Sequence, residues 1–455
     1  MKIAAVILAA GQGTRMKSAV QKVLHPVCGK PMVSFAMDAA ASNSTEKPVV
    51  IIGMDGETVR DFLGDSARCI VQEQQLGTGH AVMQAEPALR GLADLVLVTY
   101  ADMPLLRSET LAQLIEVQKN NSGPMTMLTA KSTDSRGFGR VIRDGNGSVQ
   151  AIIEEAAATP DQLALDELNV GAYCFNSDWL WEALRHIPLS PKGEYYLTET
   201  LELAVKAGLE VKALSCSDLT ETIGINTRVH LAEAETAMRS RINRKHMLAG
   251  VTIIDPATTY IEADVAIGRD SVIWPNTYLR GTTVIGESCI IGPNTVAQDM
   301  AIGDHCEILA AVMDHAVVED HVGIGPFARL RKGAHLCKGV HMGNFGEVKD
   351  STLGPGTKMG HFSYLGNATI AENVNIGAGT ITCNFDGVRK NPTEIGENAF
   401  IGSDTMLVAP VKIGARAKTG AGSVVTKNVD EDTLVVGVPA RPIKKLNEAK
   451  NDRVD

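Results

Sequence analysis

The C-terminal half of this 455-residue chain is dominated by an aliphatic residue at every sixth position. The strict runs are Ile261, Ile267, Ile273, Leu279, Ile285 and Ile291, then Ile324, Leu330, Leu336, Met342 and Val348, then Ile395, Ile401, Leu407 and Ile413. A period of six fits neither a helix nor an ordinary strand, but it fits a triangular coil that completes one flat side every six residues. The pattern predicts a left-handed parallel β-helix of roughly ten coils, each of about 18 residues, with the aliphatic side chains stacked inside.

Glycine follows many of these aliphatic residues, as in Ile267-Gly268 and Ile285-Gly286. Such positions suit corners where a Cβ would crowd the backbone. The hexads stop after Val425. We expect the following segment 437–442 (GVPARP) to be a loop and the remainder to be a polar tail.

The N-terminal half has a different pattern, in which short aliphatic runs such as Ile3 to Leu8 and Leu95 to Val98 alternate with stretches of helical pattern. This alternation predicts an α/β Rossmann-like domain with a mainly parallel sheet, whose ligands bind beyond the carboxyl ends of the strands. Residues 228–248 contain neither Gly nor Pro and favour one long helix. We therefore expect a first domain at 1–227, a helical linker at 228–249, and the β-helix with its tail at 250–455.

Composition narrows the class of partner. A formal charge of −10 argues against a nucleic acid as the main partner, and the apolar opening from Lys2 to Ala10 is too short to span a membrane. The eight cysteines are scattered, without CxxC pairs, which favours reduced thiols and a cytoplasmic protein. We expect small-molecule substrates, with neither nucleic acid nor membrane as a partner.

A glycine-containing loop follows the first predicted strand, in the string Leu8-Ala9-Ala10-Gly11-Gln12-Gly13-Thr14-Arg15-Met16, with Lys22 shortly after. Glycines let backbone N–H groups approach phosphate oxygens, and Arg15 and Lys22 offer charge to a triphosphate. A short loop of this kind alone is also compatible with a plain turn. The whole string, however, resembles the signature of sugar-1-phosphate nucleotidylyltransferases.

That resemblance implies roles for further positions of the first domain. Gln72, Gly77 and Thr78 would read the uracil of UTP, while Asp102 and Asn226 would hold Mg²⁺. Gly139, Glu154 and Asn169 would hold the sugar, with Glu154 and Asn169 at its hydroxyls and N-acetyl group, and the segment Glu194-Tyr195-Tyr196 with Thr198 matches a motif near the same pocket. Without the resemblance, Asp102 is equally compatible with a helix cap and Asn226 with a turn. In full, the implied UTP and sugar-nucleotide site consists of Leu8, Ala9, Ala10, Gly11, Gly13, Lys22, Gln72, Gly77, Thr78, Asp102, Gly139, Glu154, Asn169 and Asn226, with Arg15 and Lys22 as catalytic cations.

The β-helix carries a second set of strings: Pro326 to Arg331, Gly343-Asn344-Phe345, Gly360-His361 to Gly366, Asn375 to Asn384, and Gly402 to Thr405. Together with the first domain, they closely resemble the bacterial bifunctional N-acetylglucosamine-1-phosphate uridylyltransferase / glucosamine-1-phosphate N-acetyltransferase family, essentially from end to end. In this family acetyl-CoA acetylates glucosamine 1-phosphate, and UTP then converts N-acetylglucosamine 1-phosphate into UDP-N-acetylglucosamine. The resemblance also implies a homotrimer in which neighbouring chains complete each acetyl site.

Acetyl transfer to an amine needs a base, oxyanion donors and cations for the sugar phosphate. The resemblance makes His361 the base, oriented by Glu347, and Asn384 the group that holds the amine. Arg331, Lys349, Tyr364, Asn375 and Lys390 would bind glucosamine 1-phosphate; Ala378, Asn384, Ser403, Ala421 and Arg441 would bind acetyl-CoA, with Thr405 as a further candidate. The backbone N–H of Ala378 and Ser403 would face the oxyanion. Arg441 is a hypothesis only, because the segment GVPAR replaces the arginine-containing segment of other members.

Departures from the family pattern are Gln21, Ala101, Ala156, Val170 and Phe385. None removes a residue assigned to chemistry. The alternatives are a single-activity sugar nucleotidylyltransferase whose β-helix serves only for oligomerisation, a non-enzymatic scaffold, and a three-histidine zinc site between coils. The intact loop, Arg15, Lys22, Asp102 and Asn226 oppose the scaffold, and the histidines lack the spacing of the zinc site.

Overall fold

The computed structural model describes residues 1–446 and divides the chain into two compact units. The boundary between them lies between Met238 and Arg239, inside helix α9 (Arg228–Leu248). The first half of this helix belongs to unit 1, where the Glu235 carboxylate accepts a hydrogen bond of 2.6 Å from the backbone N–H of Cys28. The second half belongs to unit 2, where the Arg239 guanidinium lies 4.4 Å from the centre of the Tyr260 ring. Residues 228–248 therefore form the predicted helix, although each half packs within a different unit.

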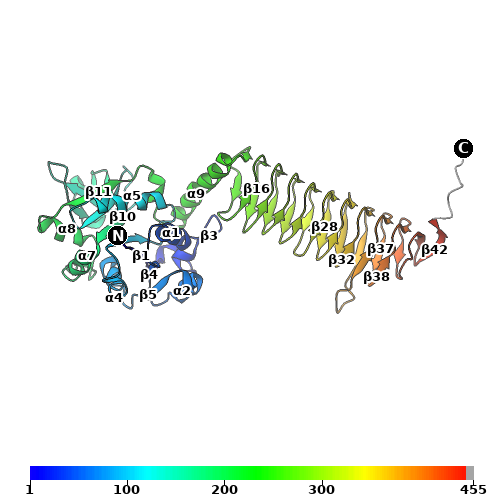
Figure 1. The fold of residues 1–455 in the computed structure, drawn as a ribbon, viewed down its shortest axis with the longest axis horizontal. Helices are drawn as coiled ribbons and strands as arrows, with labels where there is room; N and C mark the ends of the chain where they lie inside the picture. Colours follow the sequence, from blue (N-terminus) through cyan, green and yellow to red (C-terminus); the bar gives the residue numbers. More distant parts are fainter. Residues whose placement is uncertain (447–455) are drawn as a thin grey trace. The chain divides into compact units, whose positions relative to one another are not determined.

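Unit 1 is built on a nine-stranded sheet with the order β11-β7-β10-β6-β1-β4-β5, to which β8 and β9 add a hairpin (Figure 1). These strands are β1 (Ile3–Ala9), β4 (Val49–Ile52), β5 (Arg68–Val71), β6 (Leu95–Tyr100), β7 (Met125–Lys131), β8 (Arg140–Arg143), β9 (Val149–Ile153), β10 (Glu167–Asn176) and β11 (Val211–Ser215), and the short pair β2 (Pro26–Val27) and β3 (Lys30–Pro31) lies apart. Strands β1, β4, β5 and β6 run parallel, as expected, whereas β10 runs antiparallel between β6 and β7. The carboxyl ends of β1 and β6 therefore meet at one edge.

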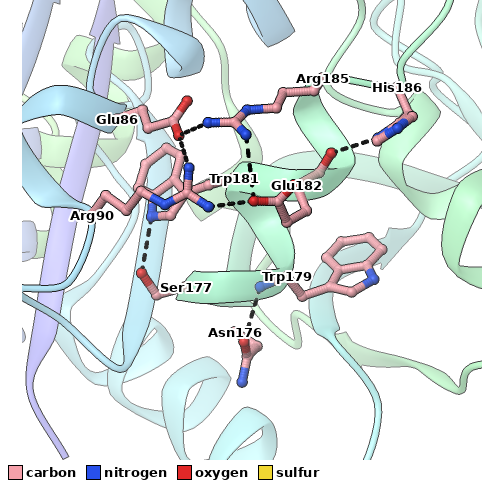
Figure 2. Close-up of polar contacts among 9 residues, drawn as sticks. All are labelled: Glu86, Arg90, Asn176, Ser177, Trp179, Trp181, Glu182, Arg185 and His186. Atoms are coloured by element: carbon pink, nitrogen blue, oxygen red, sulfur yellow. Dashed lines mark hydrogen bonds and ion pairs between the residues drawn. The ribbon is translucent and has the colours of Figure 1, made fainter.

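The helices of unit 1 are α1 (Met32–Ala41), α2 (Glu57–Leu63), α3 (Thr78–Met83), α4 (Glu86–Leu89), α5 (Ser108–Lys119), α6 (Pro160–Leu163), α7 (Ser177–Leu184) and α8 (Glu199–Lys206). An ionic network at the ends of α4 and α7 ties these two helices together (Figure 2). The Glu86 carboxylate accepts from Arg90 at 2.6 Å and from Arg185 at 2.8 Å, and Arg90 also pairs with Glu182. Beneath it, the fully buried Trp181 donates its indole N–H to Ser177 at 3.0 Å.

Unit 2 consists of three parallel sheets whose strands alternate along the chain, as in the predicted β-helix (Figure 1). The first sheet runs from β12 (Thr252–Ile253) to β39 (Lys418–Thr419) and ends with β41 (Thr433–Gly437) and β42 (Ala440–Lys445). The second runs from β13 (Thr259–Ile261) to β40 (Val424–Val425), and the third from β14 (Ala266–Ile267) to β38 (Val411–Ile413). The second sheet has ten strands, which agrees with the predicted number of coils.

The hexad residues form the inside of the coil. Ile273, Leu279 and Ile291 have no exposed surface, and Ile273 pairs in register with Ile291, 18 residues further on. Glycine occurs at tight corners, because a Cβ on Gly268 would lie 2.6 Å from the backbone carbon of Gly286 in the next coil. The hexad pattern is interrupted after Ile291 because the coils there are shorter, so that Ile302 pairs with Val318 only 16 residues later.

The end of the β-helix differs from the prediction. Residues 437–442 were expected to form a loop, but Ala440–Lys445 form β42, which pairs antiparallel with β41. The turn between these strands contains Val438 and Pro439, and the hairpin extends the first sheet past the last full coil. The rest of the predicted polar tail, residues 447–455, lies outside the described residues.

Candidate active sites

The first candidate site is a cavity of about 290 Å³ at the carboxyl ends of β1 and β6. Its lining consists of Leu8, Ala9, Ala10, Gly11, Lys22, Val23, Gln72, Gln75, Gly77, Thr78, Ala81, Tyr100, Asp102 and Glu194. The cavity thus brings together most of the residues expected to hold UTP, from segments separated by up to a hundred residues.

Lys22 joins the two residues expected to hold the metal ion. Its ammonium nitrogen lies 2.5 Å from Oδ2 of Asp102 and 3.3 Å from Oδ1 of Asn226. Both side chains of the ion pair are largely buried, with exposed fractions of 11% for Lys22 and 19% for Asp102. One carboxylate and one amide oxygen therefore converge on a single cationic centre, and this hard oxygen pair is the kind of protein ligand set that Mg²⁺ accepts beside substrate phosphates. The residues fit the expected ion.

The loop after β1 is placed against Lys22. Gly13 has φ +62°, and a Cβ there would lie 2.6 Å from Cβ of Lys22, so only glycine fits. Arg15 follows in a short 3-10 helix (Thr14–Met16) and is exposed, outside the residues that line the cavity. The structure thus brings Lys22 into the site but leaves Arg15 on the surface beside it.

Backbone hydrogen bonds to Tyr195 hold Gly77 and Thr78, which are expected to read the base. The N–H of Tyr195 donates to the carbonyl of Leu76 at 2.7 Å, and the N–H of Gly79 donates to the carbonyl of Tyr195 at 2.8 Å. Gln72 is buried, and its amide nitrogen donates to the carbonyl of Gly77 at 3.1 Å. The same nitrogen lies 3.0 Å from Nδ1 of His80, so the amide oxygen is the atom of Gln72 that remains to accept from a base N–H.

A second cavity, of about 270 Å³, adjoins the first and shares Thr78, Tyr100 and Asp102 with it. Its lining includes all the residues expected to hold the sugar, namely Gly139, Glu154 and Asn169, together with Thr198 and Asn226. Asp102 therefore faces both the cavity lined by the residues expected to hold UTP and the cavity lined by those expected to hold the sugar.

Buried hydrogen bonds hold the polar residues of the second cavity. The amide of Asn169 and the hydroxyl of Tyr173 exchange hydrogen bonds of 2.7 and 3.0 Å, and both residues are buried. Glu154 accepts a bond of 3.4 Å from the Thr198 hydroxyl, and burial raises the pKa of its carboxyl. These contacts set the rotamers of two groups that sequence assigned to the sugar.

Three polar residues of these cavities, Gln75, Tyr100 and Tyr173, escaped the sequence analysis. Gln75 donates to the carbonyl of Ala10 at 2.6 Å, which anchors the end of β1. Tyr100 and Tyr173 line the second cavity, and burial followed by the charge of Asp102 raises the pKa of Tyr100, so its hydroxyl stays protonated as a donor. Tyr100 ends the aliphatic strand β6, two residues before Asp102, and this position is the signal that could have identified it.

The second candidate site lies on the β-helix, where cations gather on the second sheet. Arg331 donates to Glu347 at 2.9 Å, and the neighbouring Lys349 lowers the pKa of Lys390. Two ammonium groups side by side repel each other and favour an anion between them. Glu347, expected to orient His361, is thus engaged by Arg331 in this chain.

The groups expected at the sugar amine lie on the neighbouring strands of the same sheet. Glu347 and Tyr364 are in register on β28 (Gly346–Lys349) and β31 (Ser363–Gly366). Asn384 follows β34 (Ile381–Cys383), is buried, and donates to Oδ1 of Asn367 at 2.8 Å. His361 is exposed at the corner that precedes β31. Asn367 was missed by sequence analysis, although it follows the recognised Gly360 to Gly366 string directly.

The residues expected to bind acetyl-CoA are spread over successive coils. The carbonyl of Ala378 accepts from the N–H of Asp404 at 2.6 Å, shortly after β33 (Asn375–Ile376), which begins with the Asn375 expected at glucosamine 1-phosphate. Ser403, Ala421 and Arg441 are exposed, Arg441 within β42. Thr405 is fully buried and bonds to Gly402 and Thr419, so it supports the coil rather than facing a ligand.

Both units match known protein families. The model of the MobA-like NTP transferase domain covers residues 5–197, and the bacterial transferase hexapeptide model covers residues 264–297 and 392–427. Over nearly the whole chain, the protein is similar to curated relatives named bifunctional protein GlmU. The relative from Geobacillus sp. (strain WCH70) is 46% identical over 97% of this chain and 96% of its own length. The relative from Shouchella clausii (strain KSM-K16) is 43% identical over 98% of this chain and 99% of its own length. The chain belongs to the GlmU family.

Membership of the GlmU family confirms the resemblance read from the sequence and makes the chain a bifunctional enzyme, with uridylyltransferase and acetyltransferase activities. The single-activity and scaffold alternatives are thereby set aside. No described helix of this GlmU-family chain has the length and apolarity needed to cross a bilayer.

Proposed function

We propose that the two cavities of unit 1 are the uridylyltransferase site and that the cationic sheet of unit 2 is the acetyltransferase site of a UDP-N-acetylglucosamine synthase. The observation that carries the first assignment is the convergence of Lys22, Asp102 and Asn226 where the two cavities meet. The second rests on the cluster of Arg331, Lys349 and Lys390.

In uridylyl transfer, a phosphate oxygen of N-acetylglucosamine 1-phosphate forms a bond to the α-phosphorus of UTP, and the bond from that phosphorus to the pyrophosphate oxygen breaks. Mg²⁺ held by Asp102 and Asn226 would supply charge neutralisation on the phosphates. Lys22 supplies a further positive charge, and Gln72 and the Gly77 segment position the base. The chain contributes position and charge, with no covalent intermediate.

In acetyl transfer, the amine of glucosamine 1-phosphate attacks the thioester carbonyl of acetyl-CoA, the C–S bond breaks, and coenzyme A leaves as the thiol. Asn384 would position the amine, and His361 would accept a proton from it. Arg331, Lys349 and Lys390 would hold the phosphate of the sugar. Tyr364 and Asn375 would contact the sugar, and Ser403 and the Ala378 N–H would face the oxyanion. Because His361 is exposed in the single chain, we propose that a homotrimer completes this site, in a cytoplasmic enzyme.

The test incubates the full-length protein with glucosamine 1-phosphate, acetyl-CoA, UTP and Mg²⁺, and omits each in turn. We expect UDP-N-acetylglucosamine only with all four. His361→Gln should abolish acetylation and spare uridylylation of added N-acetylglucosamine 1-phosphate, whereas Asp102→Asn should do the reverse. His341→Gln, at an exposed histidine of β27 (His341–Met342), is the matched control and should leave both reactions unchanged. Acetylation by His361→Gln at the wild-type rate would contradict the assignment.

A further inference from the structure

Three side chains of different chemistry meet on the third sheet of the β-helix. Glu319 follows β23 (Val317–Val318), His335 begins β26 (His335–Leu336), and Cys337 follows it. Val317 pairs with His335 and Val318 with Leu336, so the parallel register places Glu319 beside Cys337. His335 and Cys337 thus come from one coil, and Glu319 comes from the coil before it.

The ligand atoms of the cluster have the spacing of a metal site. The carboxylate, imidazole and thiol atoms all lie within 4.8 Å of one another. Nε2 of His335 lies 2.8 Å from Oε1 of Glu319 and 4.0 Å from Sγ of Cys337. In a tetrahedral zinc site with the usual bond lengths, ligand atoms are about 3.3 to 3.8 Å apart. The observed separations bracket this range, so small rotations of the side chains suffice.

A further contact orients the carboxylate. Oε2 of Glu319 accepts a hydrogen bond of 2.9 Å from the backbone N–H of Lys338, which leaves Oε1 directed at His335. Such outer contacts of ligand groups fix their orientation in metal sites. Glu319 and His335 expose 42% and 38% of their side chains, so an ion and a water as fourth ligand can reach the cluster from solvent.

The donor set selects the class of ion. An imidazole nitrogen, a thiolate and a single carboxylate suit zinc and similar transition metals, whereas Mg²⁺ and Ca²⁺ require oxygen ligands. The cluster is also separate from the proposed acetyl site, because Tyr364 and the strand that precedes Asn384 belong to the second sheet. Within one chain, a metal here therefore lies on a different sheet from the residues assigned to acetyl transfer.

We propose that Glu319, His335 and Cys337 bind one zinc-class divalent ion that clips two successive coils of the β-helix together. Because the ligands come from neighbouring coils, unfolding of either coil releases the ion. Binding therefore raises the free energy of unfolding of the β-helix. Once the free ion concentration exceeds the Kd, this gain grows with the logarithm of the ratio of concentration to Kd.

The test uses the full-length protein, stripped with a chelator and returned to saturating Mg²⁺ so that oxygen-ligand sites are filled. Titration with Co²⁺ should produce a thiolate-to-cobalt charge-transfer band with one ion per chain, and Zn²⁺ should displace it. Cys337→Ser should lose the band. Glu319→Gln should keep the band, because the thiolate is still present. Its affinity for Co²⁺ should fall at least roughly tenfold, the loss typical when a supporting group of a metal site is removed. Cys69→Ser, at a half-buried thiol in unit 1, is the matched control and should behave as wild type.

Thermal unfolding provides the second readout. Zn²⁺ should raise the Tm of the wild-type β-helix and of Cys69→Ser, but not that of Cys337→Ser, whose metal-free Tm shows whether it folds. Absence of the band in wild type, its persistence in Cys337→Ser, or its loss in Cys69→Ser would each overturn the proposal. Should Cys337→Ser fail to fold, unchanged Co²⁺ affinity in Glu319→Gln would overturn it instead.

Discussion

The Lys22 ammonium and the Asp102 carboxylate, 80 residues apart in the chain, form an ion pair of 2.5 Å that also reaches Asn226. In an enzyme that must neutralise a triphosphate, this cation lies where the reacting phosphate and its metal ion are expected. We therefore propose that Lys22, the partner of Asp102 in the free chain, also supplies positive charge to the leaving pyrophosphate.

Lys22→Met removes this charge and keeps the length of the side chain. We expect kcat for uridylyl transfer to fall by about 10²- to 10³-fold, the usual cost of losing one group that stabilises transition-state charge. Acetyl transfer should be unchanged. The measurement is pyrophosphate release beside coenzyme A release from the same preparation. Lys17→Met, at an exposed neighbour, controls for loss of surface charge. A loss below tenfold would mean that Lys22 has no role in the reaction.

Gly77→Ala tests the fit of the base-reading segment. Gly77 has φ +98°, and a Cβ would lie 2.6 Å from the carbonyl oxygen of Tyr195, so the segment must shift. We expect the KM for UTP to rise by roughly tenfold or more, since about 1.4 kcal/mol of lost binding suffices. Steady-state kinetics with UTP varied measures it. Gly145→Ala, where a Cβ meets nothing within 4 Å, should leave the KM unchanged. Equal KM values for the two variants would refute this role of Gly77.

Much of the fold follows from the sequence because its signals are periodic. The hexad at Ile273 and Ile291 fixes both the inside of the coil and its 18-residue length. The shorter coil between Ile302 and Val318 was not foreseen, since the loss of two residues from a coil leaves no mark in the composition. The strand β42 was also missed, because Pro442, Lys444 and Lys445 are residues that strands disfavour. This strand is stabilised by its pairing with β41.

Cavity-lining residues were predictable where a contiguous motif contains them, as with Leu8, Ala10 and Gly11. Gln75 and Tyr173 act through contacts with Ala10 and Asn169, which only the folded chain brings together. The Glu319 cluster left a partial signal, because Glu319 and Cys337 are one coil length apart. The cluster differs from the three-histidine site weighed from the sequence, because its donors are a carboxylate, an imidazole and a thiol.

Asn367 is the acceptor that fixes the Asn384 amide, and its replacement should slow acetyl transfer. Asn367 has φ +52°, so Asn367→Gly removes the acceptor without adding backbone strain, and Asn367→Asp restores an oxygen at the same place. We expect about a tenfold lower kcat for the glycine variant, as for loss of one hydrogen bond to a positioning group, with recovery in the aspartate variant. Coenzyme A release measures both. Equal rates in the two variants would show that Asn384 is held by other contacts.

Glu154 should make the stability of unit 1 depend on pH. Burial raises the pKa of its carboxyl above the ordinary value of 4.5, against the weaker opposing effects of the Thr198 hydrogen bond and of Lys192. The folded chain therefore holds this proton more tightly than the unfolded chain. The associated stability is fully present below pH 4.5 and is lost as the pH rises through the raised value.

Glu154→Gln removes this titration, so the variant should gain stability over wild type as the pH rises from below 4.5 to neutrality. Urea unfolding can be followed in a Trp274→Phe background, because the remaining tryptophans, Trp179 and Trp181, both belong to unit 1. Glu73→Gln, at an exposed carboxylate, should show the same pH dependence as wild type. A stability difference between Glu154→Gln and wild type that stays constant with pH would mean that the Glu154 carboxyl titrates alike in the folded and unfolded chain.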